Sequence, residues 1–223
     1  MVALSAPQAL PTPTIVPLGD SALLVRFGST LTDQANRAAI ALALALNRSP
    51  IAGVVEVVPS LVSVLLRYEP AAGTSPGTIA GELRLLLSAL DDSAPVTTPW
   101  VIPVRFDGPD LEAVSAALGM TSSQFVAAHN ARPLRVLATG FAPGFVYCGL
   151  HADELVLPRR KEVRPAVPPG SVLFAAGQTA ITATTMPTGW HVIGSTDFAN
   201  FDPSGELPTR LNAGDVLTFE VAP

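Results

Sequence analysis

The residues whose types and spacing suggest chemistry begin with a loop at positions 140–145, Gly-Phe-Ala-Pro-Gly-Phe. Gly140 and Gly144 allow backbone conformations that are closed to other residues, and Pro143 stiffens the chain between them. Phe141 and Phe145 stand beside this restricted backbone. The pattern is typical of a pocket wall, where glycine lets the backbone approach a ligand, and equally of a tight turn anchored by two core phenylalanines.

Two further segments carry polar groups suited to binding. Residues 159–164 bring together the four cations Arg159, Arg160, Lys161 and Arg164, so an anion or an acidic partner could dock there, although a charge run in a loop is also typical of a solvated surface. Gln178 and Thr179 lie between strand-like runs at 172–175 and 181–185. Their amide and hydroxyl could orient a small amide substrate, or they could satisfy the backbone of a turn.

No catalytic residue stands out. His129 shares a helix face with Phe125 but has no acid at a relay spacing, which favours a structural histidine over a general base. Cys148 is the single cysteine, so a cysteine-rich metal site is excluded, and no local signature supports it as a nucleophile. The sequence has no phosphate-binding P-loop. We therefore expect no metal and no nucleotide site on this chain alone.

Composition and charge restrict the class of protein. Apolar residues make up 48% of the 223 residues and charged residues 14%, which indicates a compact globular chain. The net charge of -5 shows no basic stripe, so we expect no nucleic-acid partner. Prolines interrupt residues 1–16 and no apolar run is long enough to span a bilayer, so we expect no membrane association and a cytoplasmic location.

The elements that must position these residues form two groups. Before position 91 the pattern predicts a strand at 22–27, a helix capped by Thr32, a hairpin of strands at 54–58 and 61–68, and a helix that begins at Ser75 with Pro76 at its first position. Residues 91–99 read as a linker. We therefore place one domain at 1–92 and another at 93–223.

The second domain begins with a strand at 100–106 and two helices. One helix opens near Asp110, and Thr121 with Gln124 predicts a capping box for the next. From Arg135 onward, short apolar runs alternate with Gly and Pro, which indicates an antiparallel barrel or sandwich.

Read together, these motifs resemble the family that contains the B-type subunit of 5-oxoprolinase, the kinase inhibitor KipI and allophanate hydrolase subunit 1. The resemblance spans nearly the whole chain and rests on an ordered set of segments, at 19–25, 140–145, 158–159, 167–172, 178–179, 189–190, 193–194, 201–202 and 214–215. It implies an α+β protein, with a ferredoxin-like sandwich domain followed by a cyclophilin-like antiparallel β-barrel. It also implies a related larger subunit with a second cyclophilin-like domain, and a further subunit for the remaining chemistry.

The resulting hypothesis is a non-autonomous subunit of an ATP-dependent hydrolase of small cyclic or acyl-urea amides, with 5-oxoproline preferred over allophanate and ATP bound by the complex. The expected substrate-binding residues are His129, Gly140, Phe141, Pro143, Gly144, Phe145, Arg159, Gln178 and Thr179. The loop, Gln178 and Arg159 are expected to form one wall of a cleft that a partner completes. The alternative is an inhibitor of a sensor histidine kinase.

The chain departs from the family pattern at several polar positions. Residues 105–110 are shorter than the usual stretch, and Ser195 stands where arginine is usual. Ala180 replaces a glycine and residues 182–183 replace a Tyr-Pro pair, while Val146 and Cys148 stand where Pro and Leu are common. These departures bear on the identity of the substrate.

Overall fold

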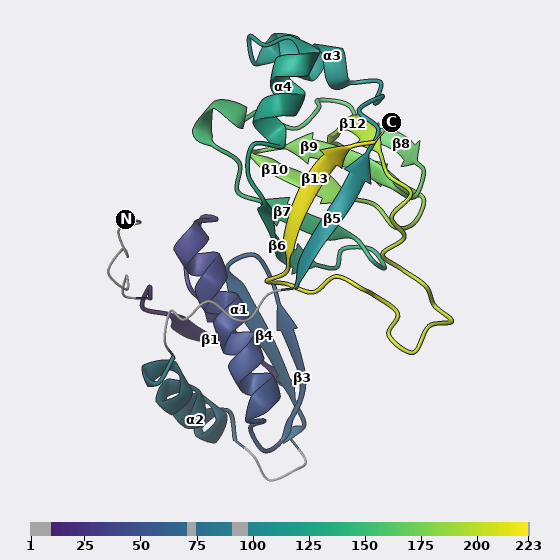
Figure 1. Ribbon diagram of the computed structural model, residues 1–223. Helices are drawn as coiled ribbons and strands as arrows, with labels where there is room; N and C mark the ends of the chain where they lie inside the picture. Colours follow the sequence, from purple (N-terminus) through teal and green to yellow (C-terminus); the bar gives the residue numbers. More distant parts are fainter. Residues whose placement is uncertain (1–9, 71–74, 91–97, 223) are drawn as a thin grey trace. The chain divides into compact units, whose positions relative to one another are not determined.

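The computed structural model describes residues 10–70, 75–90 and 98–222 (Figure 1). The chain forms two compact units, residues 1–96 and 97–223, and each is described by itself. The domain boundary predicted at 92/93 falls outside the described ranges, as does most of the predicted linker. In the part of the chain that is described, no helix is long and apolar enough to cross a membrane.

The N-terminal unit is an antiparallel sheet of four strands in the order β1-β2-β4-β3, together with two helices. The strands are β1 (Thr14–Leu18), β2 (Ala22–Arg26), β3 (Val54–Pro59) and β4 (Ser63–Tyr68), and the helices are α1 (Asp33–Arg48) and α2 (Pro76–Ser88). A ferredoxin-like domain has the order βαββαβ, whereas this unit has ββαββα. The α+β class is confirmed, and the ferredoxin-like fold stays a prediction.

Local sequence explains these elements. Thr32 caps α1 by accepting the Ala35 N–H at 3.2 Å, and Ser75 caps α2 by accepting the Thr78 N–H at 3.1 Å. Strand β1 escaped prediction because prolines surround it, including Pro17 within it. Proline is tolerated there because β1 is an edge strand, whose outer N–H groups need no partner.

The C-terminal unit is built on a curled sheet of seven strands in the order β12-β9-β10-β7-β6-β13-β5 (Figure 1). The strands are β5 (Pro99–Val104), β6 (Leu134–Thr139), β7 (Val146–Gly149), β9 (Ser171–Ala175), β10 (Gln178–Ile181), β12 (His191–Ser195) and β13 (Val216–Val221). Arg105 and Ser195 exchange two backbone hydrogen bonds of 2.8 Å, which join the two ends of the sheet. The closure is consistent with a cyclophilin-like barrel, but the sheet is not wholly antiparallel as predicted, because β13 pairs with β5 in parallel.

Smaller elements complete this unit. Helices α3 (Leu111–Ala117) and α4 (Ser122–His129) lie at one end of the sheet (Figure 1), and Thr121 with Gln124 forms the predicted capping box. A short 3-10 helix (Asp153–Leu155) follows β7, and β8 (Arg164–Val167) pairs with β11 (Met186–Thr188). After α4, the predicted absence of α-helices is confirmed for the described residues.

The seven-stranded sheet packs on both faces. On β9, Val172 and Phe174 belong to the inner core of the barrel, whereas Leu173 and Ala175 belong to an outer cluster that includes Phe145 and Trp190. Successive side chains of a strand point to opposite faces of the sheet. Along β7, β9 and β10, side chains therefore alternate between the inner core and the outer cluster.

One sequence prediction is wrong in detail. The sequence pattern places Gln178 and Thr179 in a turn before a strand at 181–185, but both lie inside β10, which ends at Ile181. The turn consists of Ala176 and Gly177, with φ of 51° and 70°. Positive φ at both central residues is the geometry of a two-residue hairpin, so the next strand begins earlier than expected.

Candidate functional site

The loop at 140–145 connects β6 to β7 and is held by hydrogen bonds. Gly140 N donates to Phe145 O at 3.0 Å, and Phe145 N donates to Ala142 O at 3.1 Å. The buried amide of Asn200 donates to Gly144 O at 2.9 Å. Because these bonds fix the loop at both ends, it is a rigid feature.

Two positions in this loop have unusual constraints. A Cβ at Gly144 would lie 2.5 Å from the Phe201 Cβ and 2.7 Å from the Ala183 Cβ, so only glycine fits. Phe141 has φ of 78° and an exposed fraction of 78%. Left-handed backbone is costly for a bulky residue, and here it holds an aromatic side chain out in solvent. A turn that merely anchored two core phenylalanines would bury both.

An aromatic row continues from the loop along the outer face of the sheet. Ring centroids are 5.8 Å apart for Phe141 and Phe145, 4.8 Å for Phe145 and Tyr147, and 5.9 Å for Tyr147 and Trp190. The Arg159 guanidinium carbon lies 5.6 Å from the centroid of Trp190, in cation–π contact. Burial raises the pKa of Tyr147, and the charge of Arg159 acts in the opposite direction. Arg159 is thus positioned by aromatic rings.

The cation cluster at 159–164 divides into two parts. Arg160 Nη1 lies 2.6 Å from Asp110 Oδ1, and Arg164 Nη2 lies 2.9 and 3.0 Å from the two oxygens of the same carboxylate. Asp110 is buried and also accepts the Val192 N–H at 2.8 Å. These two arginines therefore join the segment to α3 and β12, and Arg159 is the exposed guanidinium of the cluster that pairs with no carboxylate among the described residues.

Gln178 lies on the same outer face. Ala180 pairs with Tyr147 across β10 and β7, and Gln178, two residues earlier, is therefore a diagonal neighbour of Tyr147. Its exposed fraction is 9%, and its Oε1 is buried without a hydrogen-bond partner among the described residues. An unpaired buried amide oxygen costs about 1–3 kcal/mol, a cost that a hydrogen bond from a group outside the described residues would offset.

Thr179 points to the opposite, inner face and joins two histidines. His129 Nδ1 lies 2.6 Å from Asn130 Oδ1, an atom that only accepts, so Nδ1 carries the proton. His129 Nε2 then accepts the Thr179 hydroxyl proton at 2.7 Å, and the same oxygen accepts from His151 Nε2 at 2.8 Å. The result is one directed chain of hydrogen bonds, from His151 through Thr179 and His129 to Asn130.

Both histidines are neutral. Burial lowers the pKa of His129 to about 4, against a smaller opposing effect of the Asn130 hydrogen bond. Burial, with smaller contributions from His129 and Arg132, lowers the pKa of His151 to about 3. Neighbouring rings of the inner core enclose His129, namely those of Phe106, Phe125, Phe174 and Phe219. A histidine enclosed by aromatic rings in this way has a structural role in the barrel. Its sequence context also favours a structural histidine over a general base.

Other reactive groups are also constrained. Cys148 is fully buried, and burial raises its pKa, so the thiol stays protonated and is unsuited to nucleophilic attack. Within residues 10–70, 75–90 and 98–222, no three His, Cys, Asp or Glu side chains come together as a metal site.

A cavity of about 440 Å³ lies beside Arg105, whose guanidinium holds the exposed carboxylate of Asp197 with bonds of 2.8 and 2.9 Å.

The predicted site residues therefore fall into two groups. The loop, Arg159 and Gln178 share the outer face of the sheet, whereas His129 and Thr179 lie inside the barrel. Sequence reasoning missed Tyr147, although its spacing from Phe145 in a strand places both on one face. It also missed His151, which only the fold brings to Thr179.

Comparison with known proteins adds to this geometry. A family model described as carboxyltransferase domain, subdomain C and D, matches residues 13–211. The B-type subunit of 5-oxoprolinase from Bacillus subtilis (strain 168) is 32% identical over 215 residues, which cover 91% of this chain and 90% of that protein. The crystal structure of TTHA0988 matches with a TM-score of 0.80 and 36% identity over 92% of this chain, which spans only 40% of that one.

A more distant structure supports the fold alone. The Kluyveromyces lactis urea carboxylase matches 100% of this chain with a TM-score of 0.74 at 14% identity, and this chain covers 23% of it. The same arrangement of elements is thus found within a much longer polypeptide.

Proposed function

The chain belongs to the family described as carboxyltransferase domain, subdomain C and D, and from this premise we propose that it is one subunit of an ATP-dependent complex that hydrolyses a small amide. The similarity to a 5-oxoprolinase subunit over nine-tenths of both chains favours 5-oxoproline over allophanate as the substrate. The complex would act in the cytoplasm.

The observation that carries the proposal is the unpaired polar chemistry of the outer face. Gln178 offers an amide with no partner for its Oε1 among the described residues, and the exposed guanidinium of Arg159 is held on Trp190 rather than on a carboxylate. The substrate 5-oxoproline carries one lactam and one carboxylate. Gln178 matches the lactam and Arg159 the carboxylate, because an amide both donates and accepts and a guanidinium binds carboxylate in a fork.

In hydrolysis, water adds to the lactam carbonyl carbon, the carbon–nitrogen bond breaks, and the nitrogen takes a proton to give glutamate. The residues of this chain would bind and orient the ring while the aromatic row excludes water from one side of it. We assign no base to this chain, because its buried histidines are bonded to Thr179 and its thiol stays protonated.

Partner subunits would supply the remaining chemistry. The sequence contains one lysine, Lys161, and no glycine-rich phosphate loop, so it does not fit ATP by itself, and we place the nucleotide on another subunit. We propose a related larger subunit with a second cyclophilin-like domain, and a further subunit. Phe141, exposed at the end of a rigid loop, is suited to meeting that larger subunit.

The test is reconstitution. The chain is purified alone and with the related larger subunit and the further subunit of the same organism, and formation of ADP and glutamate is measured with 5-oxoproline and ATP, with allophanate as a second substrate. We expect turnover only by the complex. Robust hydrolysis by the chain alone would contradict the subunit role, and inhibition of a sensor histidine kinase without any amide hydrolysis would favour the inhibitor.

A further inference from the structure

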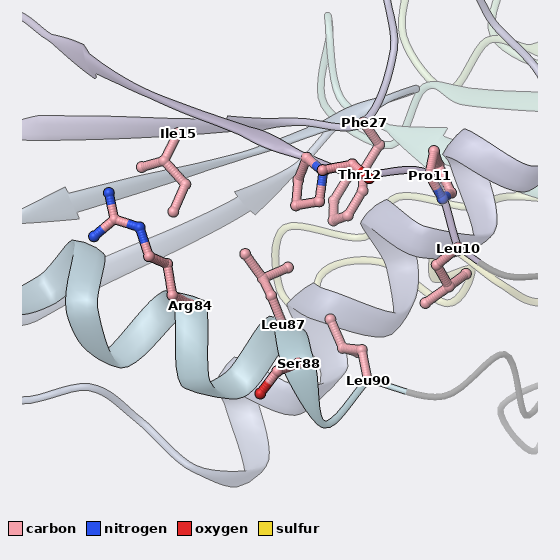
Figure 2. Close-up of a pocket in the computed structure, with 10 residues that line it drawn as sticks. Leu10, Pro11, Thr12, Ile15, Phe27, Arg84, Leu87, Ser88 and Leu90 are labelled. Atoms are coloured by element: carbon pink, nitrogen blue, oxygen red, sulfur yellow. The ribbon is translucent and has the colours of Figure 1, made fainter.

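A groove of about 500 Å³ lies within the N-terminal unit, between helix α2 and the chain that leads into β1. Figure 2 shows Arg84 and Ile15 at one end of the groove, Leu10 and Pro11 at the other, with Phe27 between them. The remaining lining residues are Thr12, Pro13, Leu87, Ser88 and Leu90. Its volume is in the range of small-molecule pockets, about 300–1,000 Å³.

The groove lies along the second half of α2, where the side chains of the helix become less buried. Leu83 is fully buried in the core of the unit, whereas Leu87, one turn later, is only partly buried. Pro11 and Pro13 fix an extended backbone opposite the helix, and such a wall needs little ordering when a ligand binds. The apolar surface of this groove is therefore formed by stiff elements.

Charge is distributed unevenly along the groove. None of the lining residues is acidic, and Arg84 is the one cation among them. Arg84 is exposed and takes part in none of the ion pairs of the described residues. The hydroxyl of Ser88 donates to Leu85 O at 2.7 Å, which leaves its oxygen only as an acceptor. The Arg84 guanidinium is thus the one charged donor that an anion would meet in the lining.

We propose that this groove binds an amphipathic carboxylate, with its head on Arg84 and its apolar body along Phe27 and Leu87 toward Leu90. A neutral apolar ligand would leave the guanidinium unused, and a purely polar anion would leave the apolar walls in water. The groove is formed by residues of the N-terminal unit alone, so it is a different site from the amide site proposed for the C-terminal unit.

The probe is decanoate, titrated below its micelle concentration into the full ¹⁵N-labelled chain, with two-dimensional NMR as the readout. We expect saturable shifts confined to amides around Ile15, Phe27 and residues 84–90. Arg84→Gln should weaken decanoate roughly tenfold, because a charge-assisted bond is lost. Arg48→Gln, with the same charge change at the end of α1, should leave the affinity unchanged.

Two more measurements separate a groove from nonspecific binding. Ser88→Trp should fill the groove and abolish the shifts while the chain keeps its parent fold, and 1-decanol should bind the parent chain as weakly as decanoate binds Arg84→Gln. Shifts that spread without saturation, shifts confined to residues 97–223, or equal decanoate affinity in parent and Arg84→Gln would each overturn the proposal. Reconstituted amide hydrolysis is measured separately, so the failure of one site does not decide the other.

Discussion

Polar side chains on the two faces of strands β7 and β10 differ in their hydrogen bonding. On the inner face, Thr179 bonds to His129 and His151, and the chain of hydrogen bonds continues to Asn130. On the outer face, the neighbouring Gln178 keeps a buried amide oxygen without a partner among the described residues. The two residues are adjacent in sequence, and the alternation of the strand separates their surroundings.

The contrast distinguishes support from binding. A buried polar group that is fully bonded stabilises one arrangement of the core, whereas an unbonded one costs free energy that a ligand or partner can offset. We therefore propose that the inner histidines support the fold of the barrel and that the outer face binds the ligand. Substitutions on the inner face of the sheet should mainly change the free energy of unfolding. Substitutions on the outer face should mainly change the hydrolytic activity of the complex.

The largest effect is expected inside, from Thr179→Val. This change leaves both histidine Nε2 atoms buried without a partner, at about 1–3 kcal/mol each, so the free energy of unfolding should fall by about 2–6 kcal/mol. Urea unfolding followed by tryptophan fluorescence measures it, because Trp100 and Trp190 both lie in residues 97–223. Thr179→Ser keeps the hydroxyl and should stay close to the parent; equal stability of Thr179→Val and parent would refute the role of the relay.

A fall in pH should weaken the same region. His129 and His151 have pKa values of about 4 and 3 in the fold, below the ordinary 6.5. The unfolded chain therefore binds protons that the folded chain excludes, so stability is complete above pH 6.5 and declines as the pH falls toward 4. His129 alone contributes about 3 kcal/mol to this loss. The urea midpoint of unfolding should be lower at pH 4 than at pH 7, and the difference should be smaller for His151→Leu than for the parent. Equal differences in the two proteins would count against these pKa shifts.

Within the cation cluster at 159–164, Arg160 should contribute more to stability than Arg159. Arg160→Gln removes a 2.6 Å charged bond to Asp110 and should cost about 1–2 kcal/mol, because Arg164 still holds the carboxylate. Arg159→Gln removes only an exposed cation–π contact and should cost about 0.5 kcal/mol. The same unfolding assay compares the two variants, and a greater loss for Arg159→Gln would reverse the assignment.

The smallest effect on stability is expected for Gln178→Leu. The change removes a buried amide oxygen that has no partner among the described residues and keeps a side chain of similar size, so stability should stay the same or rise by up to about 1 kcal/mol. Gln178→Ala controls for lost packing. A large loss in Gln178→Leu would show that the amide is bonded within the fold.

The sequence predicted most local structure because the signals were local. Caps at Thr32, Ser75 and Thr121 and the hairpin before Tyr68 depend on neighbouring residues, and the structure confirms them. Strand β1 was missed because its prolines are acceptable only at an edge, and edge position is a property of the whole sheet.

The site was less predictable because its distinctions are spatial. No local pattern shows that Arg160 and Arg164 turn to Asp110, more than 45 residues away in sequence, or that Arg159 turns to Trp190. Gln178 and Thr179 form one pair in the sequence pattern, because a turn would allow both to face a ligand. The short turn at Ala176 and Gly177 places them in a strand and on opposite faces.

The most direct test of the outer-face assignment is 5-oxoproline-dependent ATP hydrolysis by the reconstituted complex carrying Gln178→Leu, with subunit assembly confirmed by gel filtration. If the outer face binds the amide, turnover should fall at least tenfold, equivalent to about 1.4 kcal/mol, while the unfolding midpoint stays at or above that of the parent. Parent-like turnover by an assembled Gln178→Leu complex would contradict the claim that the unpaired outer amide is there for the substrate.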